Sequence, residues 1–500
     1  MAELEELSCT DLQARLTDGS LTSRALTAWY LARIAALDQA GPMLKSVIEV
    51  NPEALARAEA LDEERSAGRG RGPLHGLPLL LKDNLDTGDQ MQTTAGSLAL
   101  AGWRAPHDST VAERLRAAGA VLLGKTNLSE WANFRSTRPT SGWSSRGGRT
   151  RNPYALDRNP SGSSSGSGVA ASANLCAAAI GTETDGSIIS PAAANGLVGL
   201  KPSVGLVSRA GIIPISASQD TAGPMTRTVR DAALLLNAIA GPDPRDRATE
   251  AAVPELDYTR FLAADGLRGA RLGVARNFFG FHPRVDRLLE DALATLRAQG
   301  AELVDPANLT LPPECDQNEF QVLLYEFKDG LNRYLAGVDP ALPAHSLAEV
   351  MAFNTAHAER TMPLFGQEIL QQAEAKGGLD SAEYQKALGD NLRIVRGAID
   401  GLLAEHQLDA LLAPAGAPAW ITDVVNGDHY LGGCTSPAAI AGYPNLTVPA
   451  GLLAGLPVGL CFFGGQWQEG KLLRLGYAFE QATQARRPPQ FRPTIEWPEW

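Results

Sequence analysis

The chain has 500 residues, a formal net charge of −12 and 44% hydrophobic residues, which is typical of a soluble globular protein. Its acidity argues against nucleic acid as a partner, and its apolar runs are shorter than the roughly 20 residues of a membrane span. Five cysteines without CxxC spacing argue against a metal site, and an acidic start without a signal peptide predicts a cytoplasmic protein.

The N-terminal half alternates predicted helices and strands. Apolar residues at helical spacing predict helices over 10–37, 108–118, 166–175 and 228–240. Short apolar runs predict strands over 74–81, 120–123, 177–181, 197–207 and 211–215, the first of which ends at Lys82. This alternation indicates an α/β organisation with parallel strand pairing.

The C-terminal half repeats the pattern more loosely around a long helical block. Strands are expected over 271–275, 302–304, 409–413, 446–450 and 457–463, and helices over 284–299 and 470–485. Residues 316–406 keep helical periodicity throughout, so we interpret them as a helical insertion. Because we find neither a linker nor an internal repeat, we expect one domain over residues 1–500.

A Ser- and Gly-rich segment covers residues 141–168, where eight of 28 residues are Ser and six are Gly. Such a composition is usual for a flexible linker. Trp143, Tyr154 and the apolar strand expected downstream indicate instead an ordered loop system.

Two common motifs are present, and their context argues against both. Residues 119–126 (GAVLLGKT) fit the phosphate-loop pattern, but their middle residues are strand formers rather than a loop that could cradle an anion. Residues 162–166 (GSSSG) fit the G-x-S-x-G nucleophile elbow, but a turn-rich segment precedes them where the elbow needs an apolar strand. No histidine lies in a distinctive setting for a hydrolase triad.

A third motif, GTETDGSI at 181–188, follows a predicted strand directly. A strand that runs into a Gly-Ser turn places backbone N–H groups and a hydroxyl at the edge of the sheet where α/β proteins bind ligands. We therefore expect the backbone N–H groups of Thr184, Asp185, Gly186 and Ser187 to form an oxyanion hole.

Several blocks between residues 70 and 240 resemble the signature of the amidase signature family. They are GLPLLLKDN around Lys82, GKTNLSE, the run 162–202 with GSSSGSG, GTETDGSI and PAAANGLVGLKP, and SQDTAGPM. Weaker similarity extends over nearly the whole chain. The resemblance implies a large mixed, mostly parallel central sheet with helices on both faces, and neither a metal nor an organic cofactor.

The resemblance also implies a serine–serine–lysine catalytic set. Ser187 would be the nucleophile, Ser163 the bridging serine on a cis peptide, and Lys82 the base. The two serines lie 24 positions apart, as in the family. A lysine accepts a proton at neutral pH only if burial lowers its pKa, and Lys82 ends a run of apolar residues that could bury it.

Within the family, the resemblance is closest to bacterial peptide amidases, which remove the C-terminal amide of peptides. The similar segments are 127–135, 141–144, 324–328, 352–354 and 364–368. Many family members have Arg two residues after the nucleophile, whereas this chain has Ile189 there. The apolar side chain favours a neutral, extended acyl group over a small anionic substrate such as malonamate.

Alternative functions remain open at this point. The glutamine-hydrolysing subunit of a tRNA-dependent amidotransferase shares the catalytic set, as would a general aliphatic or aryl amidase. The helical block at 316–406 weighs against the amidotransferase reading. Because all three catalytic residues are present, a non-catalytic protein with the same fold is disfavoured. We expect a small amide or a peptide amide as substrate, with no nucleic-acid or membrane partner; nothing predicts an oligomeric state.

Overall fold

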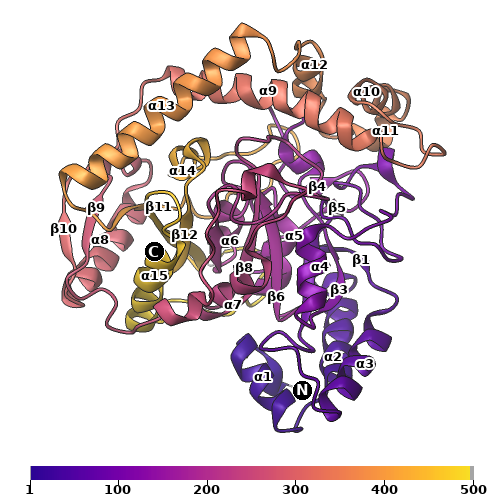
Figure 1. Ribbon diagram of the computed structural model, residues 1–500, viewed down its shortest axis with the longest axis horizontal. Coiled ribbons are helices and arrows are strands. Elements are labelled where there is room, and N and C mark those ends of the chain that lie inside the picture. Colours follow the sequence, from indigo (N-terminus) through magenta and orange to yellow (C-terminus); the bar gives the residue numbers. More distant parts are fainter. Residues whose placement is uncertain (1, 496–500) are drawn as a thin grey trace.

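The computed structural model describes residues 2–495, and its centre is a mixed sheet of eleven strands (Figure 1). In spatial order the strands are β1 (Val47–Val50), β3 (Val121–Thr126), β2 (Pro78–Lys82), β6 (Ala178–Glu183), β8 (Thr221–Thr226), β7 (Val198–Lys201), β12 (Asn445–Leu453), β13 (Leu456–Phe463), β11 (Ala410–Pro414), β9 (Arg271–Val274) and β10 (Glu302–Val304). A separate pair joins β4 (Trp143–Ser144) to β5 (Gly148–Arg149).

The expected mixed sheet is confirmed, but the expectation that it is mostly parallel is wrong. Six of its pairings are antiparallel and four are parallel. Parallel neighbours need a crossover, which α4 (Thr110–Ala117) supplies between β2 and β3 and α8 (Pro283–Ala298) supplies between β9 and β10. In the middle of the sheet short connections reverse the chain, as in the β12–β13 hairpin, and the strands become antiparallel.

Helices cover both faces of the sheet. The remaining helices outside the insertion are α1 (Cys9–Thr17), α2 (Ser23–Arg33), α3 (Ala54–Ser66), α5 (Ser165–Ser172), α6 (Ile189–Ala194), α7 (Val229–Ile239), α14 (Thr435–Ala441) and α15 (Glu469–Thr483). Side chains alternate across a strand, so neighbouring residues of β11 enter different cores. Leu412 joins the core that contains α8 and α15, whereas Leu411 joins the one that contains Ile189 of α6 and Ile440 of α14.

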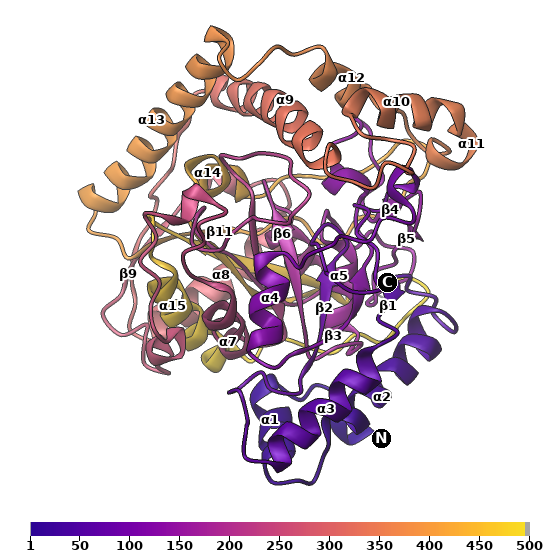
Figure 2. The same cartoon turned by 45° about the vertical axis from the view of Figure 1, so that its right-hand side comes forward.

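Residues 314–405 carry the helices expected over 316–406. These are α9 (Glu314–Leu335), α10 (Leu347–Ala356), α11 (Ala358–Thr361), α12 (Glu368–Glu374) and α13 (Ala382–Glu405). In both views α9 and α13 arch over one side of the sheet (Figures 1 and 2). Leu324 and Phe327 of α9 share a core with Trp131 and Phe134 of the N-terminal half, so the insertion packs directly on the part of the chain that follows β3.

Two strand predictions fail for identifiable reasons. The strand expected over 211–215 is wrong, because this segment is a loop in which Ile212 makes only an isolated bridge to Leu85. Strand β8 was not predicted, because it contains Gly223 and Pro224, which are typical of turns rather than central strands. Among residues 2–495, no helix combines the length and the apolar character needed to cross a membrane.

Candidate active site

The lysine, the bridging serine and the proposed nucleophile lie near the carboxyl ends of two neighbouring parallel strands. Strand β2 ends at Lys82 and its neighbour β6 ends at Glu183, just before the turn that carries Ser187. The Lys82 Nζ donates to Ser163 Oγ at 2.8 Å. It also donates to the hydroxyl of Thr182 at 2.9 Å and to its carbonyl at 3.2 Å, so the ammonium group has three acceptors.

The environment of Lys82 makes it a base at neutral pH. All five residues of β2 are buried, and the exposed fraction of Lys82 is 0%. Burial penalises the charged form and lowers the lysine pKa to about 7, although the carboxylates of Asp220 and Glu183 act in the opposite direction. A substantial fraction of Lys82 is therefore an uncharged amine at neutral pH.

The Ser-rich segment is an ordered loop system, and its neighbouring serines have different contacts. Ser163 follows Gly162 through a cis peptide bond and presents its hydroxyl to Lys82. The hydroxyl of Ser164 instead donates to the carbonyl of Thr182 at 2.9 Å, and the Ser164 N–H donates to the carbonyl of Ser187 at 3.2 Å. Ser164 thus fastens the loop to the Ser187 turn and leaves Ser163 to contact the lysine.

The turn that holds Ser187 is fixed by a buried carboxylate. Glu183 Oε2 accepts hydrogen bonds from the N–H groups of Ile188 at 2.7 Å and Ile189 at 2.9 Å. Gly186 has φ +73°, and a Cβ there would lie 3.0 Å from both the Ser190 and the Thr435 hydroxyl oxygens, so a side chain is not accommodated without a shift.

The four backbone N–H groups predicted to form an oxyanion hole are available. Within residues 2–495, the N–H groups of Thr184, Asp185, Gly186 and Ser187 donate to no protein acceptor. Ser187 itself is 7% exposed, so the turn reaches solvent at its tip while its flanks are buried. An anion that develops next to Ser187 would therefore meet unpaired donors.

Two carboxylates of this site were not identified from the sequence. Asp220 accepts hydrogen bonds from the Thr184 hydroxyl at 2.5 Å and from the N–H groups of Ile215 at 2.8 Å and Ser216 at 2.9 Å. Burial raises the pKa of Asp220 to about 6. The second carboxylate is Glu183. Asp220 lies in the SQDTAGPM block, which was the available signal, but its proximity to Lys82 depends on strand β8, which was not predicted.

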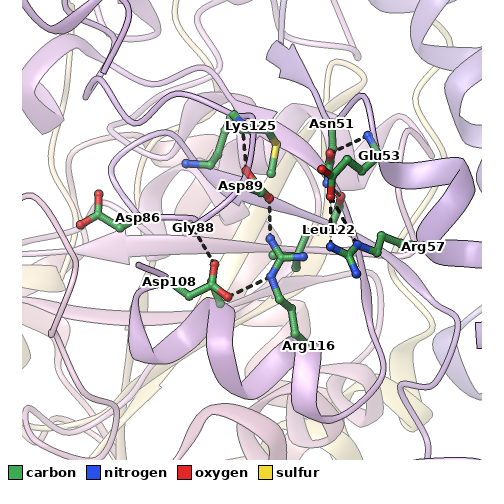
Figure 3. Close-up of polar contacts among 12 residues, drawn as sticks. Asn51, Glu53, Arg57, Asp86, Gly88, Asp89, Asp108, Arg116, Leu122 and Lys125 are labelled. Carbon is green, nitrogen blue, oxygen red and sulfur yellow. Dashed lines mark hydrogen bonds and ion pairs between the residues drawn. The ribbon is translucent and has the colours of Figure 1, made fainter. Parts of the chain in front are cut away.

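The phosphate-loop pattern does not form an anion site. Residues 121–126 are the buried strand β3, and Lys125 Nζ donates to the carbonyl of Leu85 at 2.7 Å and to the hydroxyl of Thr93 at 2.9 Å. A cavity of about 560 Å³ lies beside this strand, and Figure 3 shows Arg116 held there between Asp89 and Asp108. With the guanidinium paired to two carboxylates, the cavity has no strong attraction for a phosphate.

The elbow-like motif also lacks the required context. Residues 162–166 lead into α5 directly from a loop, with no strand before them. Within the described part of the chain, no three His, Cys, Asp or Glu side chains lie together in an arrangement that could hold a metal ion. The five cysteines are free thiols buried in the interior.

Comparison with known proteins defines the family. The amidase family profile matches residues 25–473, so the chain belongs to the amidase family and is an amidase signature hydrolase. A probable amidase of Arabidopsis thaliana is 44% identical over 98% of this chain and 92% of its own length. The corresponding chain of the glutamyl-tRNA(Gln) amidotransferase of Chloroflexus aurantiacus is 39% identical over 97% of this chain and 98% of its own.

Solved structures are similar over the full length. The peptide amidase PAM in complex with the competitive inhibitor chymostatin superposes with a TM-score of 0.93 and 53% identity, covering 98% of this chain and all of that one. The native peptide amidase of Stenotrophomonas maltophilia gives a TM-score of 0.92 and 54% identity, covering 97% of this chain and 99% of that one. The fold is therefore that of a peptide amidase, with the same extent.

Proposed function

We propose that this protein hydrolyses the C-terminal carboxamide of peptides through an acyl-enzyme on Ser187. The observation that carries the proposal is the 2.8 Å hydrogen bond between Ser163 Oγ and a completely buried Lys82 whose pKa is about 7. A serine hydroxyl is a weak nucleophile until a base removes its proton, and a neutral lysine relayed by a second serine supplies that base.

In the first step Ser187 Oγ attacks the carboxamide carbon. The Ser187 proton passes to Ser163, whose own proton passes to the neutral amine of Lys82. The carbonyl oxygen becomes an oxyanion, which the N–H groups of residues 184–187 stabilise. The ammonium group of Lys82 then returns a proton through Ser163 to the amide nitrogen, the C–N bond breaks, and ammonia leaves.

In the second step water takes the place of ammonia. The relay removes a proton from the water as it attacks the acyl-enzyme, and the ester bond to Ser187 breaks. The proton returns through Ser163 to the oxygen of Ser187, which restores the enzyme and releases the peptide acid. The proton count closes within Lys82, Ser163 and Ser187, and the relay contains no titratable group other than the lysine.

Two observations favour a peptide amide over other amides. Ile189 is fully buried and apolar at the position where many family members have Arg, so this position offers no partner to a small anionic substrate. The solved peptide amidases are 53% and 54% identical, whereas the amidotransferase chain of Chloroflexus aurantiacus is 39% identical. A general aliphatic or aryl amidase remains the alternative that uses the same catalytic set.

The test is ammonia release from a panel of amides by the purified protein alone. We expect turnover of C-terminal peptide amides, slower turnover of fatty amides and aryl amides, and little from glutamine or malonamate. Efficient hydrolysis of glutamine, combined with no hydrolysis of peptide amides, would instead favour the glutamine-hydrolysing role in an amidotransferase. We also expect chymostatin to compete with the peptide amide.

The catalytic roles are tested by substitution. Ser187→Ala and Ser163→Ala should each reduce ammonia release by about a thousandfold or more, because triad members act as a unit. Ser172→Ala is the matched control, since this buried serine at the end of α5 is not one of the hydrogen-bond partners of Lys82. An active-site probe should label Ser187 in the control and not in Ser187→Ala; substantial activity of Ser187→Ala would refute the assignment.

A further inference from the structure

Exposed apolar side chains concentrate on the loop that connects β11 to α14. Nine large hydrophobic side chains are exposed in residues 2–495, and five of them lie within 421–431: Ile421, Val424, Val425, Tyr430 and Leu431. Single exposed apolar residues are normal on a protein surface, but a group on one loop marks a binding surface.

This loop borders the largest cavity that the structure describes. The cavity has a volume of about 770 Å³ and is lined on its apolar side by Trp420, Ile421, Leu431 and Leu456. Ligand sites usually have about 300–1,000 Å³. Arg158 and Arg284 lie on its rim opposite Asp423 and Asp428, so the two charge signs balance and the recognition is mainly apolar. We call this space the loop cavity.

A single layer of aromatic side chains lies between the loop cavity and the Ser187 turn. Trp420 lines the cavity, and its ring packs edge-on against Tyr430, with the ring centroids 6.0 Å apart. Tyr430 in turn lies beside Ser190 and Asp185, both on the segment that carries Ser187, and burial together with the Asp185 charge raises the pKa of its hydroxyl. The cavity therefore begins where the wall of the active site ends.

A second connection runs to the bridging serine. Asp428 accepts hydrogen bonds from the N–H and the hydroxyl of Ser141 and, at 3.2 Å, from the indole N–H of Trp420. A Cβ on Gly162 would lie 3.4 Å from the Cβ of Ser141, so Ser141 packs against the peptide that carries Ser163. The loop is thus held in register with both catalytic serines rather than attached loosely.

We propose that the loop cavity binds the apolar residues that precede the C-terminal residue of a peptide amide. This inference rests on the proposed function. An extended peptide advances about 3.3 Å per residue, so two residues span the aromatic layer between Ser187 and the cavity. A single amino-acid amide reaches Ser187 alone, whereas a tripeptide amide or a longer one also fills the loop cavity.

The test is a length series measured with the purified protein. The substrates are leucinamide and the di-, tri- and tetrapeptide amides made of leucine. We expect kcat/KM to rise about tenfold to a hundredfold once the chain reaches the cavity, because burying one leucine side chain has an effect of this size. The change should appear mainly in KM, since the contacts are made far from the reacting carbon.

Variants assign the effect to this cavity. Ile421→Ser and Leu431→Ser should remove most of the gain for long substrates and leave leucinamide turnover unchanged. The matched control is Val253→Ser, which makes the same kind of change at a position that is 86% exposed and does not line the cavity. Because both cavity residues are exposed, their substitution should not affect folding, which circular dichroism can verify.

Each outcome is informative. Equal kcat/KM for all lengths, or a length gain that survives both Ser variants, overturns the loop cavity and leaves the proposed function intact. The absence of hydrolysis for every amide overturns the proposed function itself. If Ile421→Ser instead abolishes concentration-dependent self-association and does not alter the length series, the surface is an interface between two copies of this chain and the inference is wrong.

Discussion

Acidification through the pKa of Lys82 should switch the enzyme off. With a folded-state pKa of about 7, about half of the lysine is neutral near pH 7 and about a tenth near pH 6. An ordinary lysine, with a pKa near 10.4, would be neutral in only about one molecule in two thousand at pH 7. The neutral amine is the reactive form, so kcat/KM should fall tenfold per pH unit below about pH 7, and burial raises activity at neutral pH about a thousandfold.

The measurement is kcat/KM for a neutral peptide amide from about pH 5 to about pH 9, in buffers of constant ionic strength. A substrate with a blocked N-terminus removes its own titration, and the far-ultraviolet circular dichroism at each pH shows whether the fold persists. A profile that is flat down to about pH 5 would refute the role of Lys82 as the base, as would an acid limb near the pKa of an ordinary carboxylate.

Three substitutions extend this reasoning. Asp220→Asn removes a carboxylate that stabilises charged Lys82, so the lysine pKa should decrease and the acid limb should move to lower pH; an unchanged limb would contradict this coupling. Glu183→Gln weakens acceptance from the Ile188 N–H and should lower the free energy of unfolding by about 1–3 kcal/mol, measured by urea denaturation. Gly186→Ala places a Cβ at φ +73° and should reduce kcat about a hundredfold by displacing the turn, with little change in KM; wild-type kcat would show that the turn tolerates the methyl group.

The strands beside the catalytic residues were predictable, and those in the middle of the sheet were only partly so. Strands β2 and β6 are short, purely apolar or small-residue runs next to turn residues, and both lie within a residue or two of their predicted ends. Strand β8 lies between β6 and β7, yet Gly223 and Pro224 hide it from any pattern of hydrophobicity. The mostly parallel prediction failed for the same reason, because β8 supplies antiparallel partners to both neighbours.

The site followed the same division between local and distant contacts. Lys82 at the end of an apolar run could be expected to be buried, and the turn with Ser187 could be expected to present free N–H groups. The influence of Asp220 on Lys82 could not be read from the sequence, because it requires β8 to pair with β6. The contact of Asp220 with Thr184 has the same origin, since it joins the start of β8 to the turn after β6.

Burial of Lys82 has a cost in stability that a substitution can reveal. A folded-state pKa of about 7 against 10.5 means that the protonated lysine destabilises the folded state by about 5 kcal/mol below pH 7. This penalty decreases as the pH rises from about 7 to about 10.5, where the unfolded chain also loses its proton. Lys82→Met keeps the volume and removes the charge, so it should abolish ammonia release. The same variant should raise the free energy of unfolding at about pH 6, with the gain reduced by the lost contacts to Ser163 and Thr182. A variant that is inactive and also less stable at that pH would show that those hydrogen bonds outweigh the burial cost.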